Sequence, residues 1–180
     1  MLRTIKRDGW KVLALLLLGG CLDVLSMVVA KYFVLLLLMG ALGYLIQQVL
    51  PTCLHERKTF WNIGWKYIVW RLLVEMVILV VLISAGVSYA LLKWPFFIIA
   101  NTLFLGFLCA AGNNTGLWRG IKTLITKYTL RWLCALVVIK LALWVGAFLP
   151  AITFVNGMWI TLVNVLVVYG CLPLFKSQAK

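Results

Sequence analysis

Six long apolar runs, separated by short polar connections, dominate the pattern of residues along the chain. They are Val12–Ala30, Phe33–Leu50, Leu72–Leu92, Pro95–Ala111, Trp132–Pro150 and Thr153–Phe175. A helix that crosses the hydrocarbon core of a bilayer needs about 20 mainly apolar residues, and each run is close to that length. The pattern predicts an all-α, polytopic integral membrane protein in which about six transmembrane helices form three hairpins.

Two of the connections predict amphipathic interfacial helices on the cytoplasmic side, over residues 58–71 and 116–131. Such helices lie in the headgroup region, with aromatic rings toward the acyl chains and basic side chains toward anionic lipid. The expected interfacial anchors, or alternatively partner contacts, are Lys58, Trp61, Trp65, Lys66, Trp118, Arg119 and Lys122. Lipid anchoring is favoured over a cytoplasmic partner, because Trp is enriched at membrane interfaces in any case.

The Lys and Arg residues are distributed very unevenly between the connections. Of the 17, 14 lie before the first run, after the second, after the fourth and after the sixth. The other connections hold only Lys31 and Lys93, and Lys140 lies within the fifth run. Because basic residues are retained on the cytoplasmic side, this bias predicts cytoplasmic N- and C-termini and an even number of spans. We expect the membrane to be a bacterial inner membrane.

Composition supports a single transmembrane domain over residues 1–180. Hydrophobic residues make up 65% of the chain and charged residues 12%, against about 45–50% and 25% in soluble domains. A net charge of +13 would fit nucleic-acid binding, but the basic residues flank apolar runs, as they do in membrane proteins. We therefore expect the partners to be the bilayer, its anionic headgroups and other membrane subunits, and no nucleic acid.

Three ionisable residues lie within the apolar runs, where charge is costly and marks candidate functional sites. Counted at about 1.5 Å per residue, Asp23 lies roughly 18 Å and Lys140 roughly 13 Å into their spans. A buried Asp23–Lys140 pair is therefore predicted, serving either packing, which we favour, or transport. Glu75 follows Arg71 by four residues, the spacing of an interfacial ion pair along one helix.

Other polar or small residues in the runs predict contacts between helices. The amides of Gln47, Gln48, Asn101, Asn156 and Asn164 are expected to form interhelical hydrogen bonds. Gly40 and Gly43 indicate close approach of two helices and not a phosphate loop, which would require a following helix in water.

Residues suited to catalysis are scarce. The chain has one histidine, His55, and four acidic residues. The letters Cys53-Leu54-His55-Glu56 lack the second ligand pair of a zinc site. We expect no catalytic, metal or cofactor site and no enzymatic activity.

Two hypotheses for function follow. The first is a non-enzymatic subunit or accessory protein of a larger membrane assembly, related to transport or secretion. The alternative is a small transporter or substrate-binding membrane component for a small molecule. In topology alone the layout is similar to the substrate-binding components of energy-coupling-factor vitamin transporters. Their outer lid loops have no counterpart here, where the outer connections are very short.

Overall fold

The structure is a computed structural model that describes residues 9–29, 32–55, 60–85, 89–149 and 152–175. All regular structure in these ranges is helical. The α-helices are α2 (Gly9–Val29), α3 (Phe33–Tyr44), α4 (Leu50–His55), α5 (Trp65–Ala85), α6 (Tyr89–Gly112), α7 (Leu117–Lys127), α8 (Thr129–Val145) and α9 (Thr153–Phe175). Two π-helical segments, η1 (Leu45–Val49) and η2 (Phe60–Gly64), and a 3₁₀ turn, η3 (Gly146–Phe148), complete the described elements.

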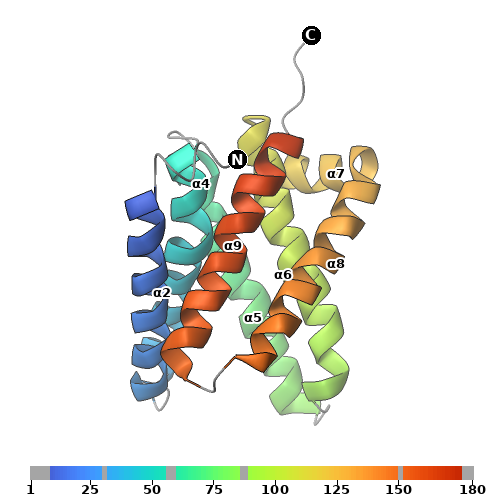
Figure 1. Ribbon diagram of the computed structural model, residues 1–180. Coiled ribbons are helices and arrows are strands. Elements are labelled where there is room, and N and C mark those ends of the chain that lie inside the picture. Colours follow the sequence, from blue (N-terminus) through green and yellow to red (C-terminus); the bar gives the residue numbers. More distant parts are fainter. Residues whose placement is uncertain (1–8, 30–31, 56–59, 86–88, 150–151, 176–180) are drawn as a thin grey trace.

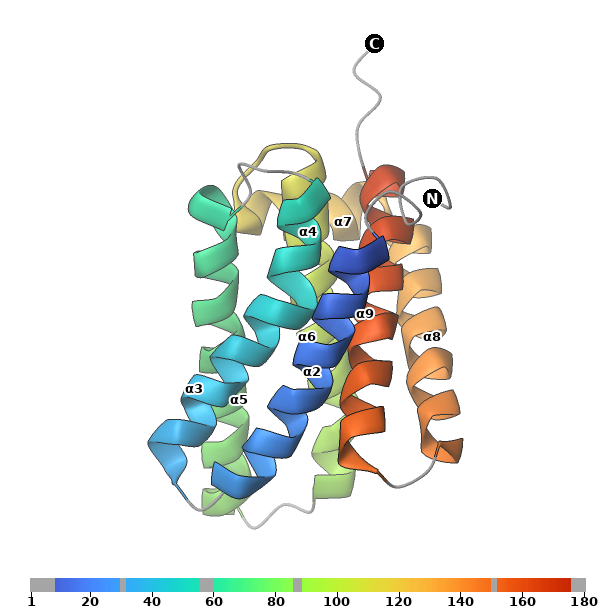
Figure 2. The same ribbon diagram turned by 60° about the vertical axis from the view of Figure 1, so that its left-hand side comes forward.

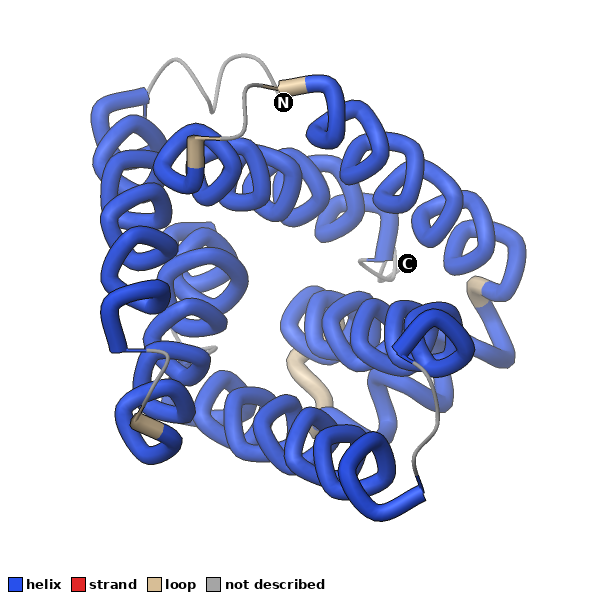
Figure 3. Tube along the Cα trace, turned by 90° about the horizontal axis from the view of Figure 1, so that it is seen from below, coloured by secondary structure: helices blue, strands red, loops and turns tan. Residues whose placement is uncertain are grey.

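Contiguous helical segments form six long columns in this part of the chain. The segments α3, η1 and α4 follow one another without a break, as do η2 with α5 and α8 with η3. The columns run side by side, with the start of α2 and the end of α9 at the same end of the bundle (Figures 1 and 2). The short helix α7 lies across that end, and α9 lies between α2 and α8 in both views. Seen along the bundle, the columns surround a common centre (Figure 3).

Several helices are long and apolar enough to span a membrane. Four described stretches have this character: Gly9–Val29, Leu37–Leu54, Trp94–Gly112 and Thr153–Phe175. The pair α7 and α8, bent by 100°, would make a fifth if it counted as one broken span. The all-α fold with membrane-compatible helices is therefore confirmed. Six spans and three hairpins stay predictions, since residues 30–31 and 150–151, at two of the expected turns, lie outside the described residues. The turn expected at Lys93 is wrong: α5 ends at Ala85 and Lys93 lies within α6, which begins at Tyr89.

The bundle is apolar both inside and on much of its surface. Its core is centred on α6, where Phe104, Phe107 and Leu108 are fully buried. On α8, Val138 and Leu141 are among many large apolar side chains that remain exposed. An apolar exterior of this extent is unfavourable in water and is typical of a surface that faces lipid.

Helices α2 and α9 pack closely through glycines. A β-carbon at Gly157 would lie 2.7 Å from the carbonyl oxygen of Gly19 and 2.9 Å from Cβ of Asp23. Small residues of this kind let two backbones approach each other within a membrane. At Gly40 and Gly43, to which the sequence pointed, the nearest atoms would be 3.6 and 3.3 Å away. The contact of α2 with α9 at Gly157 is therefore tighter than the contacts at Gly40 and Gly43.

The predicted amphipathic segment 116–131 contains a separate helix. Helix α7 buries Leu117, Gly120 and Leu124 and exposes Arg119 and Lys122. It ends at Lys127, and the chain then turns into α8, so the amphipathic helix is shorter than predicted. Its position at a membrane surface stays a prediction.

The predicted segment 58–71 is not a separate helix. From Phe60 the chain forms η2 and continues directly into α5. The physical reason lies on its buried side: Ile63 and Tyr67 pack into the core, and the Tyr67 ring stacks on Phe107 at 4.7 Å between centroids. These contacts hold the segment against the bundle, and no proline interrupts it before α5.

Candidate functional site

A π-helical turn in the second column places two glutamines beside the centre of the bundle. In η1 the backbone N–H of Leu50 bonds to the carbonyl of Leu45, five residues earlier. The wider turn accommodates an extra residue, and such turns are frequent at functional sites. Gln47 is half-buried and Gln48 is only 6% exposed.

Gln48 connects three columns through hydrogen bonds. The hydroxyl of Tyr67 on α5 donates to Gln48 Oε1. Gln48 Nε2 in turn donates to Asn164 Oδ1 on α9 at 3.3 Å. The predicted interhelical bonding is therefore confirmed for Gln48 and Asn164. Asn101 differs, because its Nδ2 donates to the carbonyl of Phe97 within α6 at 2.8 Å.

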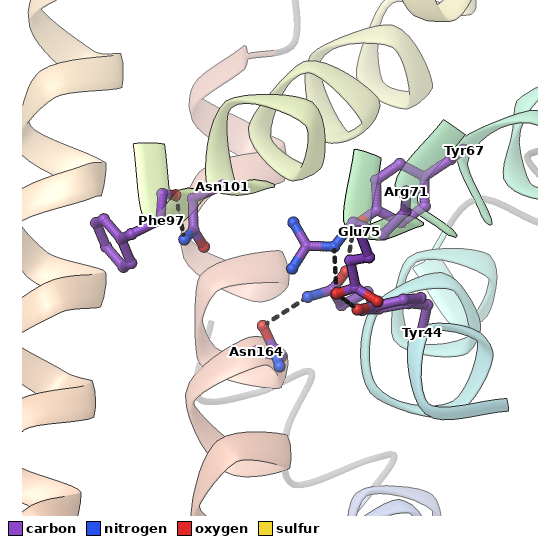
Figure 4. Close-up of polar contacts among 8 residues, drawn as sticks. Tyr44, Tyr67, Arg71, Glu75, Phe97, Asn101 and Asn164 are labelled. Atoms are coloured by element: carbon purple, nitrogen blue, oxygen red, sulfur yellow. Dashed lines mark hydrogen bonds and ion pairs between the residues drawn. The ribbon is translucent and has the colours of Figure 1, made fainter. Parts of the chain in front are cut away.

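Arg71 on α5 lies buried beside this network, with 9% of its surface exposed. Its Nε is 3.8 Å from Glu75 Oε1, and the hydroxyl of Tyr44 also donates to that carboxylate. The Arg71 Cζ lies 4.9 Å from the ring centroid of Tyr44 and 5.5 Å from that of Phe96. The predicted pair of Arg71 and Glu75 is present, but it faces the interior of the bundle (Figure 4).

Lys140 contacts aromatic rings and does not pair with Asp23. Its Nζ is 4.5 Å from the ring centroid of Trp94 and 5.0 Å from that of Phe97, both on α6. Asp23 instead lies against Gly157 of α9. The predicted Asp23–Lys140 pair is therefore not formed. The two residues stand on helices that are not adjacent, since α9 lies between α2 and α8 (Figures 1 and 2).

Several of these residues line a cavity of about 480 Å³ that lies between the columns and is open along part of its surface. Five columns contribute to its wall, and most of its polar groups come from Tyr44, Gln47, Gln48, Arg71, Asn101, Lys140 and Asn164. Figure 4 shows the end of the Arg71 side chain directed toward the side on which Asn101 and Asn164 lie. The remaining wall is apolar or aromatic and includes Trp144. Such a site can hold a small molecule by hydrogen bonds and charge while apolar surface encloses the rest of it.

The predicted interfacial anchors lie elsewhere, at the end of the bundle that carries α7. Lys66 and Arg119 line one shallow groove there. Trp118 meets Trp70 edge to face, with 5.0 Å between ring centroids. Trp65 and Lys122 are exposed, while Lys58 and the side chain of Trp61 lie outside the described residues.

Metal coordination finds no support within the described ranges, where no three His, Cys, Asp or Glu side chains come together as a possible metal site. The side chain of His55 lies outside them.

Sequence reasoning missed the role of Arg71 as a cavity residue. Tyr67, Arg71 and Glu75 repeat every four residues, which places them on one face of a helix. That spacing is the available signal, but the overall charge pattern places Arg71 among the basic residues of a connection.

Comparison with known proteins gives no relative: no protein-family model, no curated protein and no solved structure matches the chain.

Proposed function

We propose that this protein binds a small molecule in the cavity of its helical bundle, as a small transporter or the substrate-binding component of one. The observation that carries the proposal is the cavity of about 480 Å³ with polar side chains from five columns. Ligand pockets have volumes of roughly 300–1,000 Å³. Polar and ionisable side chains inside membrane bundles are costly, and they mark substrate and ion pathways.

The membrane setting is part of the same proposal. Six spans with both termini in the cytoplasm would place the basic connections, which hold 14 Lys and Arg residues, on one side of a bacterial inner membrane. The exposed Arg119 and Lys122 of α7 would then face anionic headgroups. The cavity would lie within the thickness of the bilayer.

The hypothesis of a non-enzymatic subunit in a larger assembly stays a prediction. Its main support is the shortage of catalytic residues, and a binding protein shares that property. The buried polar groups around Gln48 and Arg71 favour binding, because a merely structural bundle gains little from the desolvation of a guanidinium.

Ligand-dependent stability tests the proposal. The detergent-solubilised protein is unfolded thermally in the presence of a panel of small polar anions, cations and neutral solutes. A ligand at 100 times its Kd stabilises the folded state by about 2.7 kcal/mol. We expect at least one solute to raise the Tm and to accumulate in vesicles that contain the protein. Asn164→Leu, in the cavity wall, should abolish that rise.

The matched control is Asn156→Leu, on the same helix but outside the cavity wall. It should keep the rise in Tm. The proposal fails if no solute raises the Tm of the wild type. It also fails if the protein is recovered only as a stoichiometric complex with other membrane subunits and no solute raises the Tm of that complex, the result that the subunit hypothesis expects.

A further inference from the structure

Arg71 is distinguished among the cavity residues because the protein leaves its hydrogen-bond donors unused. A guanidinium carries five N–H donors and no acceptor. The residue is 9% exposed, and its buried Nε has no hydrogen-bond partner. Nor does any described residue accept a hydrogen bond from its other nitrogens. Buried donors are normally satisfied, so the Nε calls for an acceptor. The terminal nitrogens are not fully buried, and Arg71 lines the cavity, so a ligand there can reach them.

The groups that contact Arg71 do not fill this need. Glu75 Oε1, at 3.8 Å from Nε, balances charge but lies beyond hydrogen-bond distance. Tyr44 and Phe96 contact the cation through their rings, which attract charge without accepting an ordinary in-plane hydrogen bond. Figure 4 shows the terminal nitrogens directed away from Glu75, toward the side of Asn101.

A second positive charge lines the same cavity. Lys140 on α8 lies over the rings of Trp94 and Phe97, and no described carboxylate pairs with it. Glu75 is the one acidic group in contact with either cation in the described ranges, since Asp23 lies against α9. Two cations and one carboxylate leave a net charge of +1 around the cavity.

We infer that the cavity binds a small oxyanion, a carboxylate or a phosphate, whose oxygens accept hydrogen bonds from the Arg71 guanidinium. The planar fork of N–H donors matches two oxygens of such a group. Lys140 supplies the second positive charge, and the amides of Gln47 and Asn101 line the space around the bound anion. This inference rests on the proposed function, since it names the chemical class that the site holds.

Other ligand classes fit the cavity less well. A cation would meet the positive charges of Arg71 and Lys140 in surroundings that screen them weakly. A neutral solute would use the amides but would leave the charged donors of Arg71 without a charged acceptor. Only an anion both balances the positive charges of Arg71 and Lys140 and gives the Arg71 donors a charged acceptor.

The test compares carboxylates with their neutral amides. Binding of acetate, benzoate and inorganic phosphate, and of acetamide and benzamide, is measured by calorimetry on the full chain in detergent. We expect the anions to bind and the amides to bind at least tenfold more weakly. Arg71→Gln should weaken anion binding by about a hundredfold and Arg71→Lys by about tenfold, as expected for loss of charged hydrogen bonds.

Two further variants keep the test decisive. Lys140→Gln should weaken anion binding even if Arg71→Gln fails to fold, because Lys140 is only half-buried. Arg119→Gln, on the exposed side of α7, should leave it unchanged. The inference is overturned if the amides bind as tightly as the carboxylates, or if the folded Arg71 and Lys140 variants bind anions like the wild type. If no solute of any charge binds, the proposed function fails as well, which is a distinguishable result.

Discussion

Helix α9 presents two different faces to its neighbours. Toward α2 it packs through Gly157, with no room for a β-carbon beside the Gly19 carbonyl. Toward the centre of the bundle it presents Asn164, which accepts a hydrogen bond from Gln48 at the edge of the cavity. The first face is tight and is built from small groups, whereas the second leaves space and is polar.

The tight face of α9 helps to hold the bundle together, whereas its polar face forms part of the candidate site. Tight contact of backbones gains dispersion energy and excludes other molecules. A polar wall around free space gains little for stability, but it can exchange its partners for those of a ligand. Substitutions on the two faces should therefore change different properties, stability on one and binding on the other.

The largest expected effect is on the tight face. Gly157→Ala forces a β-carbon to within 2.7 Å of a backbone oxygen, so α2 and α9 must separate. We expect a loss of about 1–3 kcal/mol in the free energy of unfolding, as for overpacking. Thermal or denaturant unfolding in detergent measures it.

The matched control lies on the same helix. At Gly170 a β-carbon would meet nothing within 4 Å, so Gly170→Ala should stabilise the helix by about 0.5–1 kcal/mol. Equal effects of the two substitutions would contradict the close approach of α2 and α9.

A smaller effect on stability is expected where the cavity wall is hydrogen-bonded. Gln48→Leu leaves the Tyr67 hydroxyl and Asn164 without their partner and should cost about 1–2 kcal/mol. Gln47→Leu should cost less, because the described residues include no hydrogen-bond partner of Gln47. Unfolding of both variants under one set of conditions gives the comparison, and a larger loss for Gln47→Leu would argue against the network.

The Gln48–Asn164 bond can be isolated by a double-mutant cycle. Gln48→Leu and Asn164→Leu, singly and together, should show a coupling energy of about 0.6 kcal/mol, the average for interhelical hydrogen bonds in membranes. Purely additive effects on the free energy of unfolding would mean that the two amides do not interact.

The smallest coupling is expected between two charged residues. Asp23→Asn and Lys140→Met should be additive within about 0.5 kcal/mol, because α9 lies between α2 and α8, the helices that carry the two residues. The same double-mutant cycle in the unfolding experiment tests this. A coupling of several kcal/mol would restore the buried ion pair that depth alone suggested.

The sequence predicted the presence of the helices well because long apolar runs have few other solutions in a bilayer. It misplaced the boundary between the third and fourth runs, because Tyr89–Leu92 is as apolar as the residues on either side of it and belongs to α6. It also placed Gln48 and Asn164 among five amides expected to bond between helices, but it did not pair them with each other. The pairing of Asp23 with Lys140 failed for a geometric reason. Counting residues gives the depth of a side chain along a helix, but not which neighbour its face meets. Depth alone could not place α9 between them.

The site itself was less accessible to sequence reasoning. Arg71 stands near the start of a span, where basic residues are common and usually face headgroups. Its burial depends on residues 60–71 lying against the core through Tyr67, a long-range contact that no local pattern records. The π-helical turn at Leu45–Val49 contains no proline or glycine, and only the nearby Gly43 and Pro51 indicate that the helix could be irregular there.

That turn sets the rotational phase of the column above and below it. An α-helix advances by about 100° per residue. If η1 relaxed to regular α-helix with all of its residues kept, the extra residue would no longer be absorbed by the wider turn, and α3 would be rotated by about that angle relative to α4. Tyr44 would swing away from Glu75, and the two glutamines would no longer face the cavity together. A substitution that favoured regular α-helix over the π-helical turn would therefore alter the site more than many side-chain changes within it.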